Sequence, residues 1–464
     1  MKAEKKRLGV LALTMINFAA ILNLRNLPLL STYGMAMITF YLIAALCFFV
    51  PTALISAELA SAFVEEGGMF IWVHRAIGSK TAFVCEWIGF ITTITALTTT
   101  IVCLSTSLAI SLGSTLSNGR LFVYATVVGS VWLATFLALR GTQFASRIIT
   151  IASTIGTLLP IGLMIALGIY WIVSCHPISF EPSFRALWPN FSNFSNVSFL
   201  AGVMFAFAGI EMSAYYVKDV QNPSKTYPHA IFFSMLLILG VSLAGSMTIA
   251  MVIPAGTIRI EAGVMQSLGI MLEAVHGEWL IPIIGFLMVF GGVAFVFAWI
   301  AGPARGIYAV RHTGFLPPFL QKTNAAGIPV AILYYQALMV TILAILFLFI
   351  PSISLCFWVI DASASVMMLL HYACLFVAGI VLRYKMPHAP RTYRVPFGNF
   401  GMIVLGSVGL INVLFCIVIS FFIPAEMQQT IPRSTFAWLL CGVTFLLLFP
   451  PFVFIARRKP HWKV

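Results

Sequence analysis

The chain has 464 residues, of which 61% are hydrophobic and only 8% are charged, and its formal net charge at pH 7 is +13. Soluble domains typically carry about 25% charged residues, so a soluble chain this apolar would have no polar surface to cover its core. The composition therefore excludes a string of soluble domains and predicts one polytopic membrane bundle over residues 1–464.

The apolar segments are long enough to cross a membrane as helices, each of which needs roughly 20 mostly apolar residues. A transmembrane β-barrel would instead show alternating segments of about ten residues, which the sequence lacks. We therefore predict an all-α polytopic membrane protein. Its twelve spans are expected at about 8–33, 36–63, 81–112, 121–139, 145–172, 196–217, 229–253, 279–310, 329–350, 355–383, 400–423 and 433–456.

The basic residues are distributed unevenly between the two sides of this bundle. With the N-terminus inside, the outer loops hold only Arg120, Arg185, Arg259 and Arg433, Arg25 lies within the first span, and the other Lys and Arg face the cytoplasm. This asymmetry follows the positive-inside rule and predicts that both termini are cytoplasmic. The surplus of positive charge is thus a topology signal, and we expect no nucleic-acid partner.

The polar residues give no sign of an enzyme. The eight cysteines lie mostly singly within spans and form no Cys-x-x-Cys pair, which is typical of small buried hydrophobes. The sequence has no paired His/Asp set, no nucleophile elbow and no glycine-rich phosphate loop. We expect neither a metal nor a cofactor.

Two of the predicted spans are interrupted. The first loses its apolar continuity at "NLRN" (23–26), just before Pro28, and the sixth contains "FAFAGIEMSAYY" with Gly209 and Glu211 in mid-span. These spans occupy corresponding positions in two five-helix halves, which in transporters points to the binding site. The helix ends freed at such breaks can hold a carboxylate or an ammonium group. A proline kink and a tight helix crossing at Gly209 are the purely structural alternative.

Four acidic residues fall inside or near spans: Glu58, Glu86, Glu211 and Asp361. An ionisable residue at membrane depth costs at least ~2.5–3.5 kcal/mol and marks a functional site by default. Glu58 and Glu86 lie near cytoplasmic helix ends, where they could reach water, and with Asp361 they form the expected gating or charge network. Glu211 lies deeper and is expected to act through a freed backbone group or by protonation.

Arg25 has two possible roles in the first break. It could pair with Glu211 or Asp361 as a structural lock, or it could face the cavity and receive a substrate carboxylate. The guanidinium fork suits bidentate carboxylate binding. The two roles are compatible with different states of one transport cycle.

Several stretches resemble the amino acid–polyamine–organocation transporters. "FAFAGIEMSAYYVKDVQNPSKTYPHAI" (205–231) is similar to their helix 6–7 signature, "GPARGIYAVRHTGFLPPFLQKTNAAGIPV" (302–330) to the loop after helix 8, and "RTYRVPFG" (391–398) to the segment before helix 11. Within that superfamily, "EEGGMFIWV" (65–73) and "WIAGPARG" (299–306) resemble the bacterial glutamate/GABA antiporters.

The resemblance implies a LeuT-like fold with broken helices 1 and 6. Its five-plus-five inverted repeat would cover about 8–172 and 196–383, followed by helices 11 and 12 at about 400–456. It also implies that Phe205, Ala208 and Trp299 line the substrate cavity. Phe205 and Trp299 would be aromatic gates, with lipid-facing aromatics as the alternative.

The chain departs from the superfamily in helix 1, where "ILNLR" (21–25) replaces a glycine-containing stretch. Carboxylate binding is therefore expected to pass from backbone amides to Asn23 and Arg25. The complete predicted substrate-binding set is Ile21, Leu22, Asn23, Leu24, Arg25, Phe205, Ala208, Gly209, Glu211 and Trp299.

These features predict a secondary active amino acid transporter of the bacterial inner (plasma) membrane, most simply a sodium-independent antiporter that works by alternating access. Its partners would be a small-molecule substrate and the lipid bilayer, as a monomer or a homodimer. A proton- or sodium-coupled symporter of the same fold is the alternative. A sodium symporter would need hydroxyl ligands on helix 8, but "AFVFAWIAGPARG" (294–306) contains neither Ser nor Thr.

Overall fold

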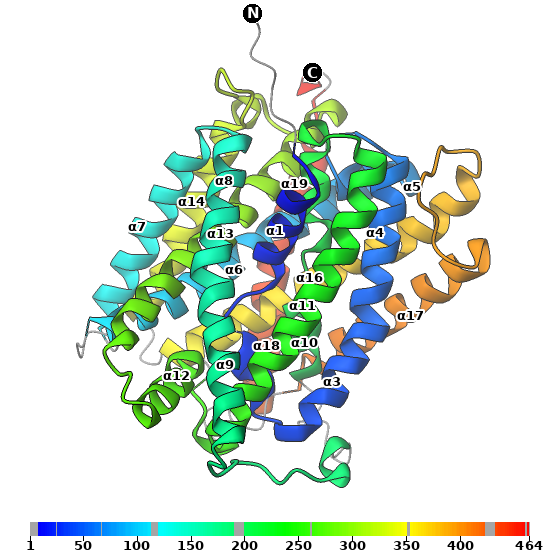
Figure 1. The fold of residues 1–464 in the computed structure, drawn as a ribbon. Helices are drawn as coiled ribbons and strands as arrows, with labels where there is room; N and C mark the ends of the chain where they lie inside the picture. Colours follow the sequence, from blue (N-terminus) through cyan, green and yellow to red (C-terminus); the bar gives the residue numbers. More distant parts are fainter. Residues whose placement is uncertain are drawn as a thin grey trace, which may run out of the picture.

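The computed structural model describes residues 8–24, 26–65, 67–112, 119–189, 199–259, 262–349, 353–422, 432–459 and 462–463. Within these ranges the regular structure is helical, apart from two isolated β-bridges. The helices run side by side as one bundle, and α1 (Val10–Ile21) and α19 (Pro450–Ala456) lie towards the same end of it (Figure 1). We call this end the termini end.

The helix bounds follow the predicted spans closely. Besides α1 and α19, the main helices are α2 (Asn26–Ser31), α3 (Met37–Ala44), α4 (Val50–Ala62), α5 (Met69–Ala76), α6 (Ser79–Ser111), α7 (Arg120–Ala138), α8 (Thr142–Ser153), α9 (Leu159–Val173), α10 (Phe199–Ala206), η7 (Ile210–Asp219), α11 (Pro223–Val252), α12 (Gly263–Ala274), α13 (Leu280–Ala309), α14 (Val330–Ala344), α15 (Leu346–Phe349), α16 (Ile353–Lys385), α17 (Gly398–Ile419) and α18 (Arg433–Leu448). Two π-helical turns, η2 (Ala45–Phe49) and η4 (Thr154–Leu158), join α3 to α4 and α8 to α9.

Ten helical stretches in the described part of the chain are long and apolar enough to cross a membrane. They coincide with ten of the twelve predicted spans, which confirms a polytopic helical membrane protein. The other two, the first and the sixth, fall on the shorter apolar helices Val10–Ile21 and Leu200–Tyr216. The total of twelve crossings and the inverted repeat remain predictions.

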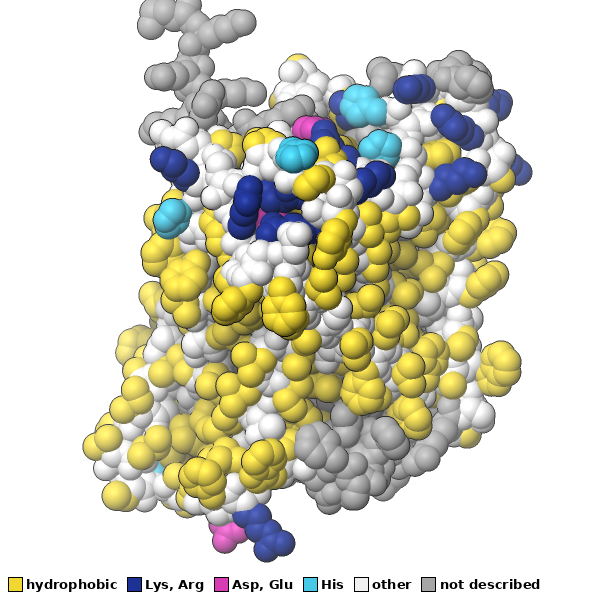
Figure 2. Space-filling model, turned by 90° about the vertical axis from the view of Figure 1, so that its right-hand side faces the viewer, with side chains coloured by type: hydrophobic (Ala, Val, Ile, Leu, Met, Phe, Trp, Pro, Cys, Tyr) yellow, Lys and Arg dark blue, Asp and Glu magenta, His cyan; other side chains and the backbone are white. Residues whose placement is uncertain are grey.

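The surface divides into an apolar belt and a basic end. On the face that carries α4, α5 and α17, hydrophobic side chains cover the middle of the molecule, and Lys and Arg gather towards the termini end (Figure 2). Large apolar side chains such as Leu133, Phe136 and Ile411 are more than half exposed. Exposure of this kind suits a lipid solvent, in which apolar side chains need no cover.

Helix α6 is the central helix of the bundle, because 94% of the residues in its most apolar stretch are buried inside the protein. Its buried face is rich in threonine, one of the small residues that membrane helices use where they pack against each other. The hydroxyls of Thr92, Thr93 and Thr98 donate hydrogen bonds to the carbonyls four residues earlier in the same helix. These threonine hydroxyls are thus satisfied within α6, as burial in an apolar bundle requires.

Helix α13 crosses η4 at backbone contact. A Cβ atom built on Gly156 would lie 2.2 Å from the Gly291 nitrogen, and one on Gly291 would lie 2.3 Å from the Gly156 oxygen. Small residues at such crossings let two helices approach closely in a membrane, where van der Waals packing rather than the hydrophobic effect holds helices together.

We predict that Gly156→Ala lowers the thermal stability of the detergent-solubilised protein. The added methyl group overpacks the crossing, and such changes typically cost about 1–3 kcal/mol. Gly162→Ala, in α9, is the matched control, because a Cβ atom there meets nothing within 4 Å. The control should be neutral or slightly stabilising, and equal melting temperatures for the two variants would contradict the close crossing.

Candidate functional site

The first span breaks between α1 and α2. The last hydrogen bond of α1 runs from the Leu22 N–H to the Phe18 carbonyl, at 2.8 Å. The Leu22 backbone is extended, with φ −76° and ψ 96°. Helix α2 begins at Asn26. The predicted interruption of the first span is confirmed. Arg25 lies outside the described residues, so both of its predicted roles stay predictions.

The sixth span breaks between α10 and η7, at residues 207–209. Gly209 has a φ of +122°, a conformation that glycine adopts without strain. A Cβ atom at Gly209 would lie 3.3 Å from the Ala20 oxygen, from a side-chain carbon of Ile21 and from the Trp299 ring. The two breaks therefore pack against each other, and Trp299 of α13 covers the contact.

Two side chains satisfy backbone groups that the breaks leave free. The indole Nε1–H of Trp299 donates to the Ala20 carbonyl at 2.7 Å, near the end of α1. The hydroxyl of Tyr372, from α16, accepts the Gly209 N–H at 2.6 Å and donates to Oε2 of Glu211 at 2.6 Å. The hydroxyl of Tyr372 thus links a freed amide to a buried carboxylate. Sequence reasoning missed Tyr372, whose only signal is a polar ring in an apolar span.

The predicted aromatic gates face the interior. Phe205 is 8% exposed, and Ala208 and Trp299 are each 3% exposed. The ring of Trp299 also packs on that of Phe295, with 5.9 Å between the centroids. These positions exclude the lipid-facing alternative for Phe205 and Trp299.

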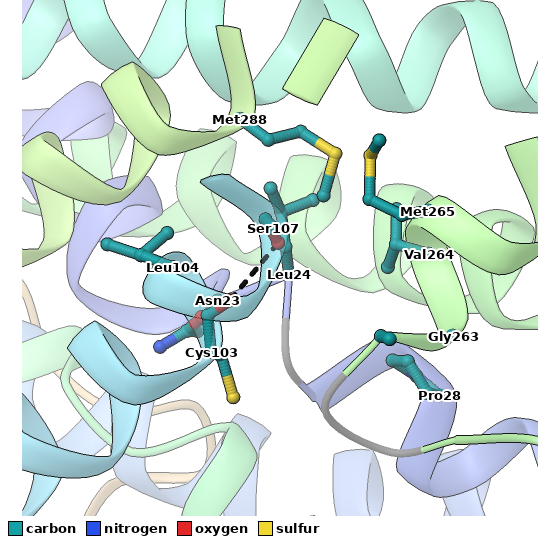
Figure 3. A pocket seen from close by; sticks show the side chains of 11 residues that line it. Asn23, Leu24, Pro28, Cys103, Leu104, Ser107, Gly263, Val264, Met265 and Met288 are labelled. Atoms are coloured by element: carbon teal, nitrogen blue, oxygen red, sulfur yellow. Dashed lines mark hydrogen bonds between the residues drawn. The ribbon is translucent and has the colours of Figure 1, made fainter. Parts of the chain in front are cut away.

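A small pocket of about 20 Å³ lies beside the break in the first span (Figure 3). This is room for about one water molecule, so anything larger can enter only if the walls move apart. Most of its walls are apolar, and the polar exceptions come from the break itself and from α6. The lining residues are Asn23, Leu24, Pro28, Cys103, Leu104, Ser107, Ala262, Gly263, Val264, Met265 and Met288.

The polar groups of this pocket are held in place by α6. The Asn23 side-chain amide donates to the Thr100 hydroxyl at 2.7 Å, and the Ser107 hydroxyl donates to the Cys103 carbonyl at 3.1 Å. Helix α12 covers one side, and a Cβ atom on Gly263 would lie only 2.7 Å from Pro28. Helix α12, which follows the seventh span, therefore packs directly on the first.

Glu58 forms a buried ionic clamp near the end of α4. Its Oε1 contacts Nη1 of Arg383 and lies 2.9 Å from Nε of Arg391, and its Oε2 accepts the Val395 N–H at 2.7 Å. The three charged side chains are at most 6% exposed. Burial and the nearby Arg383 lower the pKa of Arg391, and Glu58 opposes this shift. The clamp ties α4 to α16 and to the segment before α17.

The other two acidic residues of the expected charge network lie elsewhere. Glu86 is fully buried and accepts a hydrogen bond from the Tyr215 hydroxyl at 3.0 Å. Asp361 is half-buried in α16, 22 residues before Arg383, which corresponds to about 33 Å along a helix. In this structure neither Glu58 nor Glu86 reaches water, and Asp361 does not join the clamp.

The described residues contain no group of three or more His, Cys, Asp or Glu side chains that could hold a metal ion. The chemistry that this site offers is therefore hydrogen bonding and charge, supplied by buried carboxylates, tyrosines, an indole and backbone groups at two helix breaks.

Comparison with known proteins points the same way. A family model described as amino acid permease matches residues 8–447. An uncharacterized transporter of Legionella pneumophila is 34% identical, with 99% of this chain and 98% of the relative covered. A glutamate/gamma-aminobutyrate antiporter of Lactococcus lactis is 27% identical, with 98% and 92% covered. A probable agmatine/putrescine antiporter of the same species is 22% identical, with 86% and 82% covered.

We predict that Glu58→Gln destabilises the protein, because it leaves two buried guanidinium groups without a counter-charge. Breaking a buried ion pair by removing one partner typically costs about 3–5 kcal/mol, and the retained amide oxygen should reduce that loss. Glu65→Gln is the control, since the Glu65–Arg75 pair is 50% and 32% exposed and such pairs contribute about 0–1 kcal/mol. Thermal unfolding in detergent measures both, and equal losses would contradict the clamp.

Proposed function

Because the chain belongs to the amino acid permease family, we propose that it is a secondary active transporter that exchanges one amino acid or amine for another by alternating access. The observation that carries this proposal is the contact between two helix breaks at Ala20 and Gly209, covered by Trp299. Interrupted helices that meet in a bundle are the usual construction of transporter binding sites. The names of two of the relatives above, both antiporters, support exchange.

The substrate site of this proposal lies between the two breaks and the pocket beside Asn23. A substrate that carries a carboxylate or an ammonium group needs polar partners at this depth, because water is scarce there. Asn23 offers an amide from the first break, and the sequence places Arg25 two residues further along. We infer that Arg25 supplies the cation for a carboxylate and that Asn23 supplies a neutral hydrogen bond.

Gating in this proposal depends on the groups that hold the breaks closed. Trp299 and Tyr372 each bond to backbone at a break, so movement of α1 or α10 must exchange these hydrogen bonds for others. Glu211 bonds to the same hydroxyl of Tyr372 and is therefore placed to sense that movement. The concentration of Lys and Arg at the termini end supports a cytoplasmic position for both termini, and the bacterial relatives support the bacterial inner membrane.

We expect exchange rather than net uptake. Proteoliposomes loaded with glutamate, γ-aminobutyrate, agmatine or putrescine should take up a labelled member of this panel at least tenfold faster than empty proteoliposomes. The assay is run with and without sodium. Equal uptake into loaded and empty proteoliposomes would contradict exchange, and a strict sodium requirement would favour the symporter alternative.

We expect Arg25→Ala to weaken binding of a carboxylate substrate. Loss of one hydrogen bond to a charged group typically costs about 1.5–3 kcal/mol, which corresponds to roughly ten- to more than a hundredfold in affinity. Arg25→Lys keeps the charge but loses the fork and should be intermediate. Arg185→Ala, which removes an exposed arginine, is the control.

Protection of the purified protein from heat by substrate measures this binding without transport. Wild type and Arg185→Ala should be protected at similar substrate concentrations, and Arg25→Ala only at much higher ones. Unchanged protection of Arg25→Ala would refute the carboxylate role. If the variant instead loses stability without substrate, and a second change at Glu211 or Asp361 restores it, the internal lock is the better account.

A further inference from the structure

Glu86 is a buried carboxyl group for which the described structure provides no positively charged partner. It lies in α6 and is 0% exposed. Its Oε1 accepts a hydrogen bond from Tyr215, and its Oε2 is buried without a hydrogen-bond partner in the described structure. A Cβ atom on Gly306 of α13 would lie 1.7 Å from Oε1. Only glycine leaves room for this carboxyl group.

The nearest titratable groups come from η7, which carries Tyr215 and also Glu211. The Tyr215 hydroxyl donates to Glu86, but a phenol supplies no full positive charge. Glu211, four residues before Tyr215 in η7, is a second buried carboxylate in this region. Two carboxylates buried in one region disfavour simultaneous ionisation, because like charges repel strongly where water is absent.

The other elements packed on this turn of α6 supply no cation. From α5, the Phe70 amide approaches Glu86, but this N–H already donates to the Gly67 carbonyl at 3.0 Å. From α16, Nδ1 of His371 lies 2.8 Å from the Cys85 carbonyl oxygen and 3.5 Å from the Cys85 sulfur.

From α13, Arg305, next to Gly306, pairs with Asp219 at 3.1 Å. No hydrogen bond or ion pair among the described residues joins Glu86 to a lysine or an arginine.

A buried carboxylate without a counter-ion is costly enough that such groups usually take up a proton instead. Glu58 shows the contrast within the same molecule, since two arginines and a backbone amide neutralise and bond its carboxylate. We propose that Glu86 is a proton-binding site of the transporter, which carries a proton while Tyr215 is bonded to it and releases that proton when η7 moves away from α6.

The geometry explains why release would accompany movement. The Tyr215 ring would meet Cβ atoms built on Gly68 at 3.1 Å and on Gly302 at 3.4 Å, so the ring fills a slot between the chain before α5 and the α13 helix. Withdrawal of Tyr215 from this slot removes the hydrogen bond and opens a path for water. Water accepts the proton, and the ionised carboxylate that remains is solvated. This step rests on the proposed alternating-access function.

The protonation state itself can be measured without transport. Infrared spectra of the purified, substrate-free protein near neutral pH should contain a carboxylic acid C=O band that Glu86→Gln removes and that shifts in D₂O. Tyr215→Phe should keep the band and move it to higher frequency, because the carbonyl loses a hydrogen bond. Glu211→Gln is the matched control for the second buried carboxyl and should leave the Glu86 band in place.

Exchange in proteoliposomes provides the second readout. Alkaline pH favours release of the proton, so the exchange rate of the wild type should depend on pH in the alkaline range. In Glu86→Gln, the change in exchange rate over this range should be at most half of the wild-type change. If Glu86→Gln leaves all carboxylic acid bands intact, Glu86 is ionised and the proposal is wrong. If the band disappears but the pH profile stays that of wild type, Glu86 holds a structural proton and the coupling is wrong. If the wild type shows the band but no exchange, the proposed function is wrong, and the coupling of Glu86 to movement of η7 is wrong with it. The proton on Glu86 would still be established by the band.

Discussion

The constraint on which the structure depends is that two helices stop inside an apolar bundle, where water cannot satisfy the backbone groups they free. An unsatisfied N–H or C=O group in hydrocarbon costs several kcal/mol, so each break needs side chains from neighbouring helices. Trp299 of α13 serves the end of α1, and Tyr372 of α16 serves the start of η7. The breaks are thus stable only when α13 and α16 pack against them. A conformational change at the breaks must therefore alter the contacts of both helices.

The three buried glutamates show two ways of keeping a carboxyl group in such an interior. Glu58 is neutralised by two arginines and bridges segments far apart in the sequence, which suits a fixed joint. Glu86 and Glu211 each receive a tyrosine hydroxyl instead. A hydroxyl stabilises a carboxyl group in either protonation state, whereas an arginine strongly favours the ionised one. Under the proposed function, the tyrosine-bound carboxyls are therefore the candidates for a change of charge during the transport cycle.

Much of the fold could be predicted from the sequence, because span length and apolar continuity are local properties. The interruptions at 23–26 and at Gly209 were equally visible, since a charge, an asparagine or a glycine in mid-span interrupts an apolar run at a definite position. The partners could not be predicted: Tyr372 lies 161 residues from Glu211, and Arg383 lies 325 residues from Glu58. Nothing local in the sequence says which tyrosine or arginine faces a given carboxylate.

Helix α13 connects these parts through its glycines, which serve different purposes along one helix. Gly291 lets η4 approach to backbone contact, Gly302 leaves space beside the Tyr215 ring, and Gly306 leaves space for the Glu86 carboxyl group. A close glycine crossing resists separation, because any shift opens a void or creates a clash. The slot at Gly302 and Gly306 is filled by side chains from η7 and α6, which can withdraw without disturbing the α13 backbone. The same helix can therefore be rigid against η4 and permissive towards η7, which is what a bundle needs if one broken helix is to move while its neighbours stay in place.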